Sequence, residues 1–332
     1  MLSTLIVGCG NIAGGFDAGR PAEAGPLTHA GAFQRHGGFA LTACVDPDAA
    51  RREVFAARWG VQHTAASVAA LATAPGTFDV ISICSPNAVH AEHLEAAIAL
   101  APRLIFCEKP VTGNADATEA LVARCHDAGI LLAVNYTRRW APDVVALAGE
   151  LTRGERGAVR SVVGTYTKGV LHNGGHLIDL LHLLFGPLTL TAAGDPVHDH
   201  WHDDPSVPAL LAAQGGVPIQ LGIGDARDYA LFELVVVTER GEIAMRDGGL
   251  HWTEREPGAS AAFAGYRTLG GFAERPGRYD EAMSAAVGNI ADALMTGAPL
   301  ASTGDTALAA QRLCEQISTA GIARLSDARK HR

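Results

Sequence analysis

Residues 4–13 read Thr4-Leu5-Ile6-Val7-Gly8-Cys9-Gly10-Asn11-Ile12-Ala13, a short apolar run that ends in the pattern G-x-G-x-x-A. In a turn of this kind between a strand and a helix, the glycines let the backbone approach a pyrophosphate, which then sits on the helix N-terminus. Glycine turns are common, so this pattern alone is weak evidence. The stretch predicts a first strand, a tight turn and a candidate dinucleotide site.

An acidic residue at the end of the next apolar run supports that site. Asp46 follows Leu41–Val45, where a carboxylate can bind the adenosine ribose hydroxyls and would repel a 2′-phosphate. The neighbouring Pro47-Asp48 adds no cation. The sequence therefore favours NAD over NADP, although Arg51 and Arg52 leave NADP open.

The first part of the chain alternates apolar runs with Ala-rich helical stretches. The expected strands are Thr4–Val7, Leu41–Val45, Val80–Cys84, Leu104–Cys107 and Leu131–Val134, and the expected helices are His29–His36, Ala49–Arg58, Ala88–Ala99 and Ala115–Ala128. Near-continuous apolar strands of this length are typical of a parallel sheet that is covered on both faces. We therefore predict an α/β Rossmann domain with a doubly wound parallel sheet.

The pattern changes after Trp140, where strands follow one another with few helices between them. The expected elements are helices at Pro142–Leu151, Gly175–Phe185, Tyr279–Met295 and Thr303–Ala320, and strands at Val159–Thr167, Ile219–Gly222, Leu231–Thr238, Glu242–Arg246 and Leu250–Glu254. Such a series predicts an α+β domain with a mostly antiparallel sheet and helices on one face. A length of 332 residues also favours two domains. We predict an NAD(P)-binding domain at 1–138 and a domain for substrate binding and oligomerisation at 139–332, whose last helices could pack back on the first.

An insertion separates the glycine turn from its helix. Gly14–Leu27 is rich in Gly, Ala and Pro, whereas a direct connection of this type spans only about 2–6 residues. Two interpretations fit: a lid over cofactor or substrate, or a tolerated surface loop.

Polar residues follow two further strands of the predicted sheet. Ser85-Pro86-Asn87 with His90 comes after one of them, and Glu108-Lys109-Pro110 comes after the next. In a doubly wound sheet these strand ends border the crevice for the nicotinamide half of the ligand. A lysine there can donate a proton or a hydrogen bond to a reacting carbinol or carbonyl oxygen. We expect a functional Lys109 rather than a solvated one.

These motifs, with residues 135–140 (NYTRRW), 175–179 (GHLID), Leu184 and Gly186, resemble the glucose–fructose oxidoreductase/inositol dehydrogenase/rhizopine-catabolism (Gfo/Idh/MocA) family of NAD(P)-dependent oxidoreductases. The resemblance spans nearly the whole chain. It implies a large open sheet in the second domain that commonly supports dimers or tetramers. It also implies a cis-Pro at Pro110 and substrates that are cyclic polyols, sugars or nucleotide-linked sugars.

The resemblance also implies roles for single residues. Lys109 matches the lysine that contacts the reacting hydroxyl and the nicotinamide ribose, and His176 matches a general base or substrate-orienting histidine. Many members carry an Asp four residues before this histidine, where the present chain has His172. Either His172 carries the proton instead, or His176 and Lys109 suffice, or the chain does not oxidise a simple secondary alcohol.

Hydride transfer between a nicotinamide and a ring hydroxyl or ketone of a sugar, polyol or sugar derivative is thus the expected function. The predicted cofactor ligands are Gly8, Gly10, Asn11, Ile12, Asp46, Ser85, Pro86, Asn87, His90, Glu108 and Lys109. The predicted substrate ligands are Lys109, Tyr136, Arg138, His172, Asn173 and His176, of which Lys109, His172 and His176 are catalytic candidates. The alternatives are a non-catalytic NAD-binding regulator or partner subunit, and an enzyme that recycles its NAD internally.

Charge and cysteine usage limit the partners and the cellular location that we expect. The net charge of −9 and the lack of a Lys or Arg run argue against nucleic acid or an anionic membrane as a partner. The spacing of the six cysteines matches neither a disulfide framework nor a metal site. The first residues lack a basic leader, so we expect a cytoplasmic protein. We expect no metal, and the resemblance implies a homodimer or homotetramer.

Overall fold

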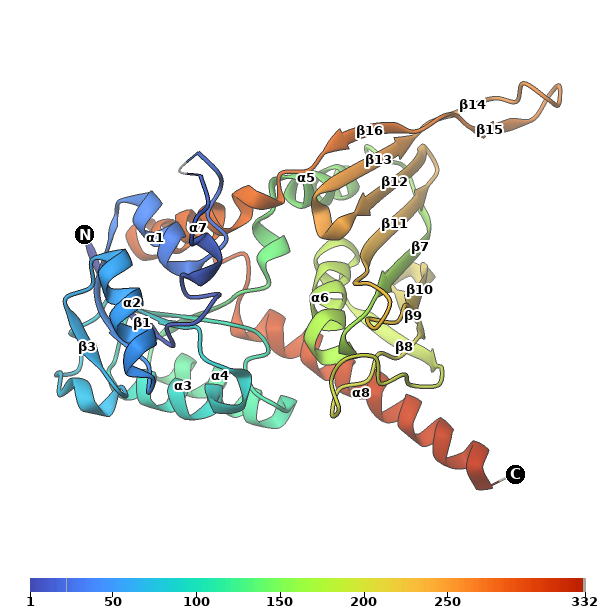
Figure 1. The fold of residues 1–332 in the computed structure, drawn as a ribbon. Helices are drawn as coiled ribbons and strands as arrows, with labels where there is room; N and C mark the ends of the chain where they lie inside the picture. Colours follow the sequence, from blue (N-terminus) through green and yellow to red (C-terminus); the bar gives the residue numbers. More distant parts are fainter. Residues whose placement is uncertain (22, 331–332) are drawn as a thin grey trace. The chain divides into compact units, whose positions relative to one another are not determined.

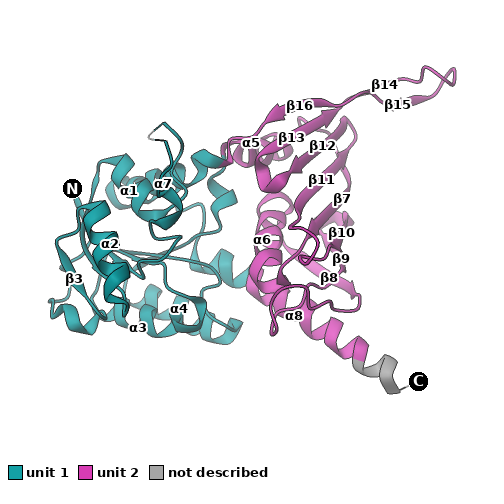
Figure 2. Ribbon diagram, viewed as in Figure 1, with its two compact units in different colours: residues 1–141, 280–309 teal, residues 142–279, 310–332 magenta. Residues whose placement is uncertain are grey.

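The computed structural model describes residues 1–21 and 23–330, which divide into two compact units (Figure 2). Unit 1 comprises residues 1–141 and 280–309, and unit 2 comprises residues 142–279 and 310–332. The segment 280–309 therefore returns to unit 1 after the chain has built the sheet of unit 2.

Unit 1 is built on a parallel sheet, which in the described residues has six strands in the order β3-β2-β1-β4-β5-β6. The strands are β1 (Leu2–Val7), β2 (Phe39–Val45), β3 (His63–Ala65), β4 (Val80–Ile83), β5 (Leu104–Cys107) and β6 (Leu131–Val134). The helices of this unit are α1 (His29–His36), α2 (Ala49–Trp59), α3 (His90–Ala99), α4 (Ala115–Asp127) and α7 (Ala282–Thr296). The strand order reverses between β1 and β4, which is where ligands of open α/β sheets bind.

The central strands β4 and β5 of unit 1 carry side chains that are buried on both faces. Every residue of β4 and β5 is buried, as expected for central strands between two helical layers. α7 comes from the far end of the chain and packs against α1 within this unit (Figure 1). The predicted Rossmann architecture is therefore confirmed.

Unit 2 is built on a mostly antiparallel sheet, which in the described residues has eight strands in the order β16-β13-β12-β11-β7-β10-β9-β8. The strands are β7 (Val159–Tyr166), β8 (Leu188–Ala193), β9 (Ala209–Ala213), β10 (Pro218–Ile223), β11 (Phe232–Thr238), β12 (Gly241–Arg246), β13 (His251–Arg255) and β16 (Ala273–Pro276). β7 and β10 pair in parallel, and the other neighbours in this sheet are antiparallel. The helices of this unit are α5 (Pro142–Thr152), α6 (Gly174–Phe185) and the C-terminal part of α8 (Gly304–Lys330). α5 and α6 lie on one side of the sheet in Figure 1, as the sequence predicts.

Several elements of the structure were not expected from the sequence. β3, β8 and β9 were not predicted, and the Gly-rich excursion after β13 forms a ribbon of β14 (Pro257–Ala259) and β15 (Arg267–Leu269). β8 shows a half-buried, half-exposed pattern with small residues, which gives a weak periodic signal. Pairing with neighbouring strands defines these segments more than their own sequence does.

Candidate active site

The glycine turn after β1 has the geometry that a dinucleotide needs. Gly8 has φ +91° and lies so close to the next strand end that a Cβ would stand 2.7 Å from the backbone N of Ser85. Around Gly10, by contrast, a Cβ would meet no atom within 4 Å. A positive φ and this close approach both require glycine at position 8. The space over Gly10 fits the approach of a pyrophosphate to the backbone.

The insertion Gly14–Leu27 interrupts the helix that follows this turn. On its far side, the N–H of His29 donates to the carbonyl of Ile12 (3.2 Å), and that of Ala30 donates to the carbonyl of Ala13 (2.9 Å). The turn and α1 are therefore joined by helical hydrogen bonds across the inserted residues. The first turn of the dinucleotide-binding helix is preserved although the chain leaves it and returns.

Asp17 closes the inserted loop from within. Its buried carboxylate accepts the N–H groups of Leu27 (2.9 Å) and Thr28 (3.2 Å), and also the Thr28 hydroxyl. The Thr28 hydroxyl in turn accepts the N–H of Gly31 as the N-cap of α1. These bonds bring the two ends of the loop together.

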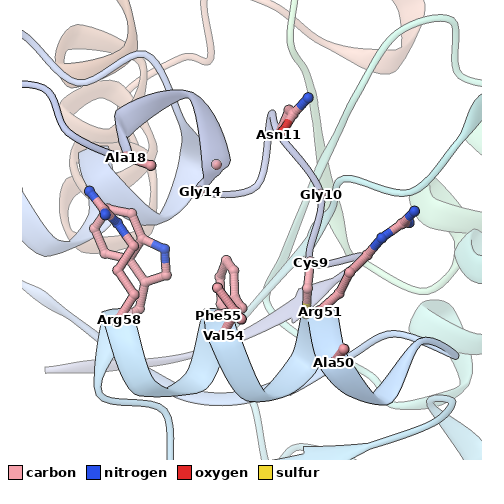
Figure 3. Close-up of a pocket in the computed structure, with 12 residues that line it drawn as sticks. Cys9, Gly10, Asn11, Gly14, Ala18, Ala50, Arg51, Val54, Phe55 and Arg58 are labelled. Atoms are coloured by element: carbon pink, nitrogen blue, oxygen red, sulfur yellow. The ribbon is translucent and has the colours of Figure 1, made fainter.

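A cavity of about 460 Å³ begins at the glycine turn and runs along α2 (Figure 3). Its walls combine the turn, the insertion and one side of α2: Cys9, Gly10, Asn11, Gly14, Gly15, Ala18, Ala50, Arg51, Val54, Phe55, Arg58 and Trp59. Arg51 and Cys9 lie at the same end of the cavity in Figure 3. The insertion therefore forms one wall of a cavity that opens beside the predicted phosphate site.

Asp46 is tied to the turn at the end of β2. One carboxylate oxygen accepts the N–H of Cys9 and the other accepts the N–H of Asp48, each at 2.9 Å. A carboxylate has further lone pairs, so these two bonds fix its orientation without exhausting its capacity as an acceptor. Arg51 is 63% exposed and pairs with Asp48 at 3.5 Å.

His90 joins two of the predicted cofactor segments. Its Nε2 lies 2.8 Å from the carbonyl oxygen of Ser85, and its Nδ1 lies 2.7 Å from that of Pro110. His90 is 1% exposed, so it is better suited to holding these two loops together by hydrogen bonds than to binding the cofactor directly. Asn87 begins a short 3₁₀ turn between these loops and is half-buried.

A buried polar network supports the end of β5. Both ring nitrogens of His29 have hydrogen-bonding partners: Nδ1 lies 2.8 Å from the Ser82 hydroxyl, and Nε2 lies 2.9 Å from Glu108 Oε1. The side-chain amide of Asn135 also donates to Glu108 Oε1 (2.6 Å). Burial of His29 lowers its pKa, but the Cys84 thiol and the Glu108 carboxylate raise it more, to about 10. Burial likewise raises the pKa of Glu108, and the bond from His29 outweighs this effect and lowers it.

Lys109 follows this network directly, and its peptide bond to Pro110 is cis, as the resemblance implies. Its backbone N–H donates to Glu108 Oε2 at 3.3 Å. Lys109 is half-buried, whereas Tyr136 and Arg138 are buried after β6. All three belong to unit 1, near the carboxyl ends of adjacent strands β5 and β6.

The predicted substrate residues of unit 2 lie where a π-helical turn, Gly169–Asn173, runs into α6. His172 Nδ1 is 2.7 Å from Asp204 Oδ2, and the His172 ring stacks on Trp201 with centroids 4.6 Å apart. The Asn173 amide donates to the Leu231 carbonyl at 3.4 Å. His176 lies one turn further on in α6 and meets Phe232 edge to face, with centroids 6.4 Å apart. Asp179 is buried on the same helix.

Two residues near these sites were missed by the sequence reasoning. His29 was assigned only to a helix, and Asp204 lay in a segment without a predicted element. Both make their contacts across long stretches of chain, 79 residues from His29 to Glu108 and 32 from His172 to Asp204. Local spacing contains no signal for such pairs, although the run of His and Asp at 198–204 is conspicuous in composition.

The described residues contain no group of three or more His, Cys, Asp or Glu side chains that could hold a metal ion. No helix among them is long and apolar enough to cross a membrane. All six cysteines are free and buried. The Cys9 thiol donates a hydrogen bond to the Cys44 sulfur, and this bond together with burial raises the pKa of Cys9.

A Rossmann sheet with an open glycine turn is the architecture of dinucleotide-binding proteins, and in this chain a unit with a large antiparallel sheet follows it. Residues 2–136 match the model of the oxidoreductase family with an NAD-binding Rossmann fold. This matched region, which lies in unit 1, is similar to the Gfo/Idh/MocA family and has an NAD(P)-binding Rossmann fold.

The chain is also similar to individual proteins, each over part of its length or at low identity. The chain is 35% identical over 120 residues to D-xylose 1-dehydrogenase (NADP(+)) 2 of Haloferax volcanii, covering 36% of each chain. It is 28% identical over 228 residues to inositol 2-dehydrogenase of Rhizobium meliloti, covering 65% of this chain and 63% of the relative. These alignments thus span only about one to two thirds of the relatives' length. A solved NAD binding oxidoreductase from Klebsiella pneumoniae shares the fold, with a TM-score of 0.77 at 18% identity and 97% coverage of both chains.

Proposed function

We propose that this protein transfers a hydride between a nicotinamide dinucleotide and a ring hydroxyl or ketone of a sugar, polyol or sugar derivative. The observation that carries the proposal is Lys109, anchored at the end of β5 beside Glu108, which His29 and Asn135 hold in place. The relatives named above are dehydrogenases of a sugar and of an inositol, which supports the substrate class.

Each unit contributes a separate part of this function. The bound nicotinamide would accept or supply the hydride, while the backbone around Gly8 and Gly10 and the carboxylate of Asp46 would hold the dinucleotide. Lys109 would hydrogen-bond the reacting oxygen and exchange its proton. His172 and His176 of unit 2 are the candidates for binding the substrate hydroxyls and accepting the proton.

Turnover with a Lys109 variant tests the proposal. We expect wild-type protein to reduce NAD with at least one member of a panel of inositols, aldoses, uronic acids and nucleotide sugars. Lys109→Met should lower kcat by about 100-fold or more while NADH still binds, because the lysine acts on the substrate oxygen. Tight NADH binding without turnover on the whole panel would favour a regulator. NAD that stays bound through purification would instead favour internal recycling.

We further propose NAD rather than NADP as the cofactor. Asp46 is oriented by Cys9 and Asp48, so its negative charge stays beside the predicted ribose position and disfavours a 2′-phosphate. Asp46→Ser should raise the KM for NAD about 10-fold, because the ribose hydroxyls lose their carboxylate acceptor. It should lower the KM for NADP, because the repulsion between the carboxylate and the 2′-phosphate is removed. Arg51→Ala is the matched variant: if it raises the KM for NADP and leaves the KM for NAD unchanged, Arg51 is the phosphate ligand. A wild-type preference for NADP would refute the assignment.

The expected setting of the protein is also a proposal. The six free, buried cysteines suit a reducing compartment, so we propose a cytoplasmic location. We propose a homodimer or homotetramer formed through the sheet of unit 2. Nucleic acid and membranes are not expected as partners, given the net charge of −9.

A further inference from the structure

A loop of unit 2, residues 199–206, holds the backbone that leads into His172. The N–H groups of residues 168–172 donate in turn to Asp199 Oδ2 (2.8 Å), the Ser206 hydroxyl (2.9 Å), the Pro205 carbonyl (3.0 Å), and Asp204 for the last two (3.0 and 2.9 Å). Such a series fixes a segment whose geometry is itself uncommon, because residues 169–173 form a π-helical turn and Lys168 has φ +67°. π-turns recur at functional sites.

The ring of His172 is constrained in three ways by the same loop. Its Nδ1 lies 2.7 Å from Asp204 Oδ2, its plane is stacked on Trp201 at an angle of 21°, and its backbone N–H shares the Asp204 carboxylate. The Asp204 side chain is 6% exposed and that of His172 is 19% exposed. The carboxylate is therefore largely removed from water while part of the imidazole still reaches the surface of the unit.

We propose that Asp204 is a positioning residue that holds His172 in the Nδ1–H tautomer, so that Nε2 serves as the proton acceptor in the reaction. A carboxylate accepts hydrogen bonds only, so a neutral His172 must carry its proton on Nδ1 and its lone pair on Nε2. This inference rests on the proposed function for the identity of the reaction, and it names the group of unit 2 that takes the proton.

In alcohol oxidation, the substrate hydroxyl would lose its proton to Nε2 of His172, and its oxygen would form a double bond to its carbon. The hydrogen on that carbon would leave with its electron pair to a bound oxidised nicotinamide. The imidazolium that results is stabilised by the Asp204 carboxylate, and it returns the proton when the reaction runs in reverse.

Asp204→Ala tests the tautomer directly. One oxygen, Oδ2, accepts the backbone N–H of His172 and lies 2.7 Å from Nδ1, so an asparagine oxygen in the same place would keep the tautomer, whereas alanine removes the acceptor from Nδ1. We expect long-range ¹H–¹⁵N spectra of histidine-labelled protein, at a pH where the His172 ring is neutral, to show Nδ1–H in the wild type and to lose that form in the variant. His172→Gln identifies the signal by its loss. A wild-type ring in the Nε2–H tautomer would overturn the proposal, and this readout needs no substrate.

Kinetics then test what the tautomer does. Asp204→Ala should lower kcat by about 100-fold or more, because Nδ1–H loses its acceptor and the lone pair is no longer held on Nε2. Asp199→Ala is the matched control: this buried carboxylate holds the same backbone but not the His172 ring, so the tautomer should stay Nδ1–H. Turnover that persists in Asp204→Ala would refute the role of the pair while leaving the proposed function intact. No turnover in the wild type would refute the proposed function, and the spectra would still decide the positioning claim.

Discussion

Glu108 and Asp204 each hold a histidine, but the two pairs differ in burial. The His29 side chain is fully buried against Glu108, whereas the His172 side chain is 19% exposed against Asp204. Both nitrogens of His29 meet polar partners inside the protein, Ser82 and Glu108. A closed pair of this kind supports the backbone around Lys109, while the more open pair can exchange a proton with a ligand.

The charge on His29 predicts how stability depends on pH. In the folded protein its pKa is raised to about 10. The ion pair therefore contributes its full stabilisation of the folded protein below the ordinary histidine pKa of about 6.5, and this contribution is lost as pH rises through about 10. At about pH 7, His29→Gln should lower the free energy of unfolding of unit 1 by about 3 kcal/mol. The gap between wild type and variant should narrow from pH 7 to 10 in chemical denaturation.

The exposed His36 on the same helix provides the control for this measurement. His36→Gln reports how alkaline conditions affect the remainder of the protein. A gap for His29→Gln that stays constant up to pH 10 would mean that His29 is neutral in the folded protein.

At the scale of elements, the π-turn of unit 2 depends on one glycine. Gly169 has φ +84°, and a Cβ there would lie 2.1 Å from Asp204 Oδ2. Both the conformation and the contact exclude a side chain, since the Asp204 carboxylate is itself tied to Leu171 and His172.

Gly169→Ala should therefore destabilise unit 2 by more than about 2 kcal/mol and displace the Asp204 carboxylate. The measurement is the thermal unfolding midpoint together with the His172 tautomer. Gly258→Ala is the control, because a Cβ at Gly258 would meet no atom within 4 Å and its φ is not positive. Equal midpoints for the two variants would contradict the strain argument.

Elements with a strong local pattern could be predicted from the sequence, and elements defined by pairing could not. β5 was predicted with its bounds at Leu104–Cys107, because a buried central strand is apolar throughout. β8 was missed because none of its residues is buried and its second half, Thr191–Ala193, has no large apolar side chain. In the same way Lys109 was proposed from its motif, whereas the contacts of His29 and Asp204 became visible only in the folded structure.

At the scale of the whole molecule, one face of the unit 2 sheet predicts self-association. Val235, Val163, Gln220 and Leu210 are directly paired across β11, β7, β10 and β9, so their side chains share one face. Val163 is 36% exposed and Leu210 is 50% exposed on this face. A largely apolar row in the middle of an open sheet is typical of an interface.

Light scattering coupled to size exclusion should accordingly give the mass of a dimer or tetramer. Val163→Lys combined with Leu210→Lys should shift it to the monomer, because two charges would have to be buried without partners. Met295→Lys, which also adds a charge at a site 71% exposed but lies in unit 1, should leave the mass unchanged. A monomeric wild type would refute the oligomer and leave the chemistry of the single chain untouched.

The hydrogen bonds from His29 to Ile12 and from Ala30 to Ala13 give the inserted loop a practical use. Its two ends meet within one helical turn, so what lies between them does not set the register of the helix. A fluorescent domain with adjacent termini could replace the middle of this loop. Such a graft would keep the glycine turn intact. Since the loop also forms a wall of the cavity beside that turn, the graft would report dinucleotide occupancy as a change in emission.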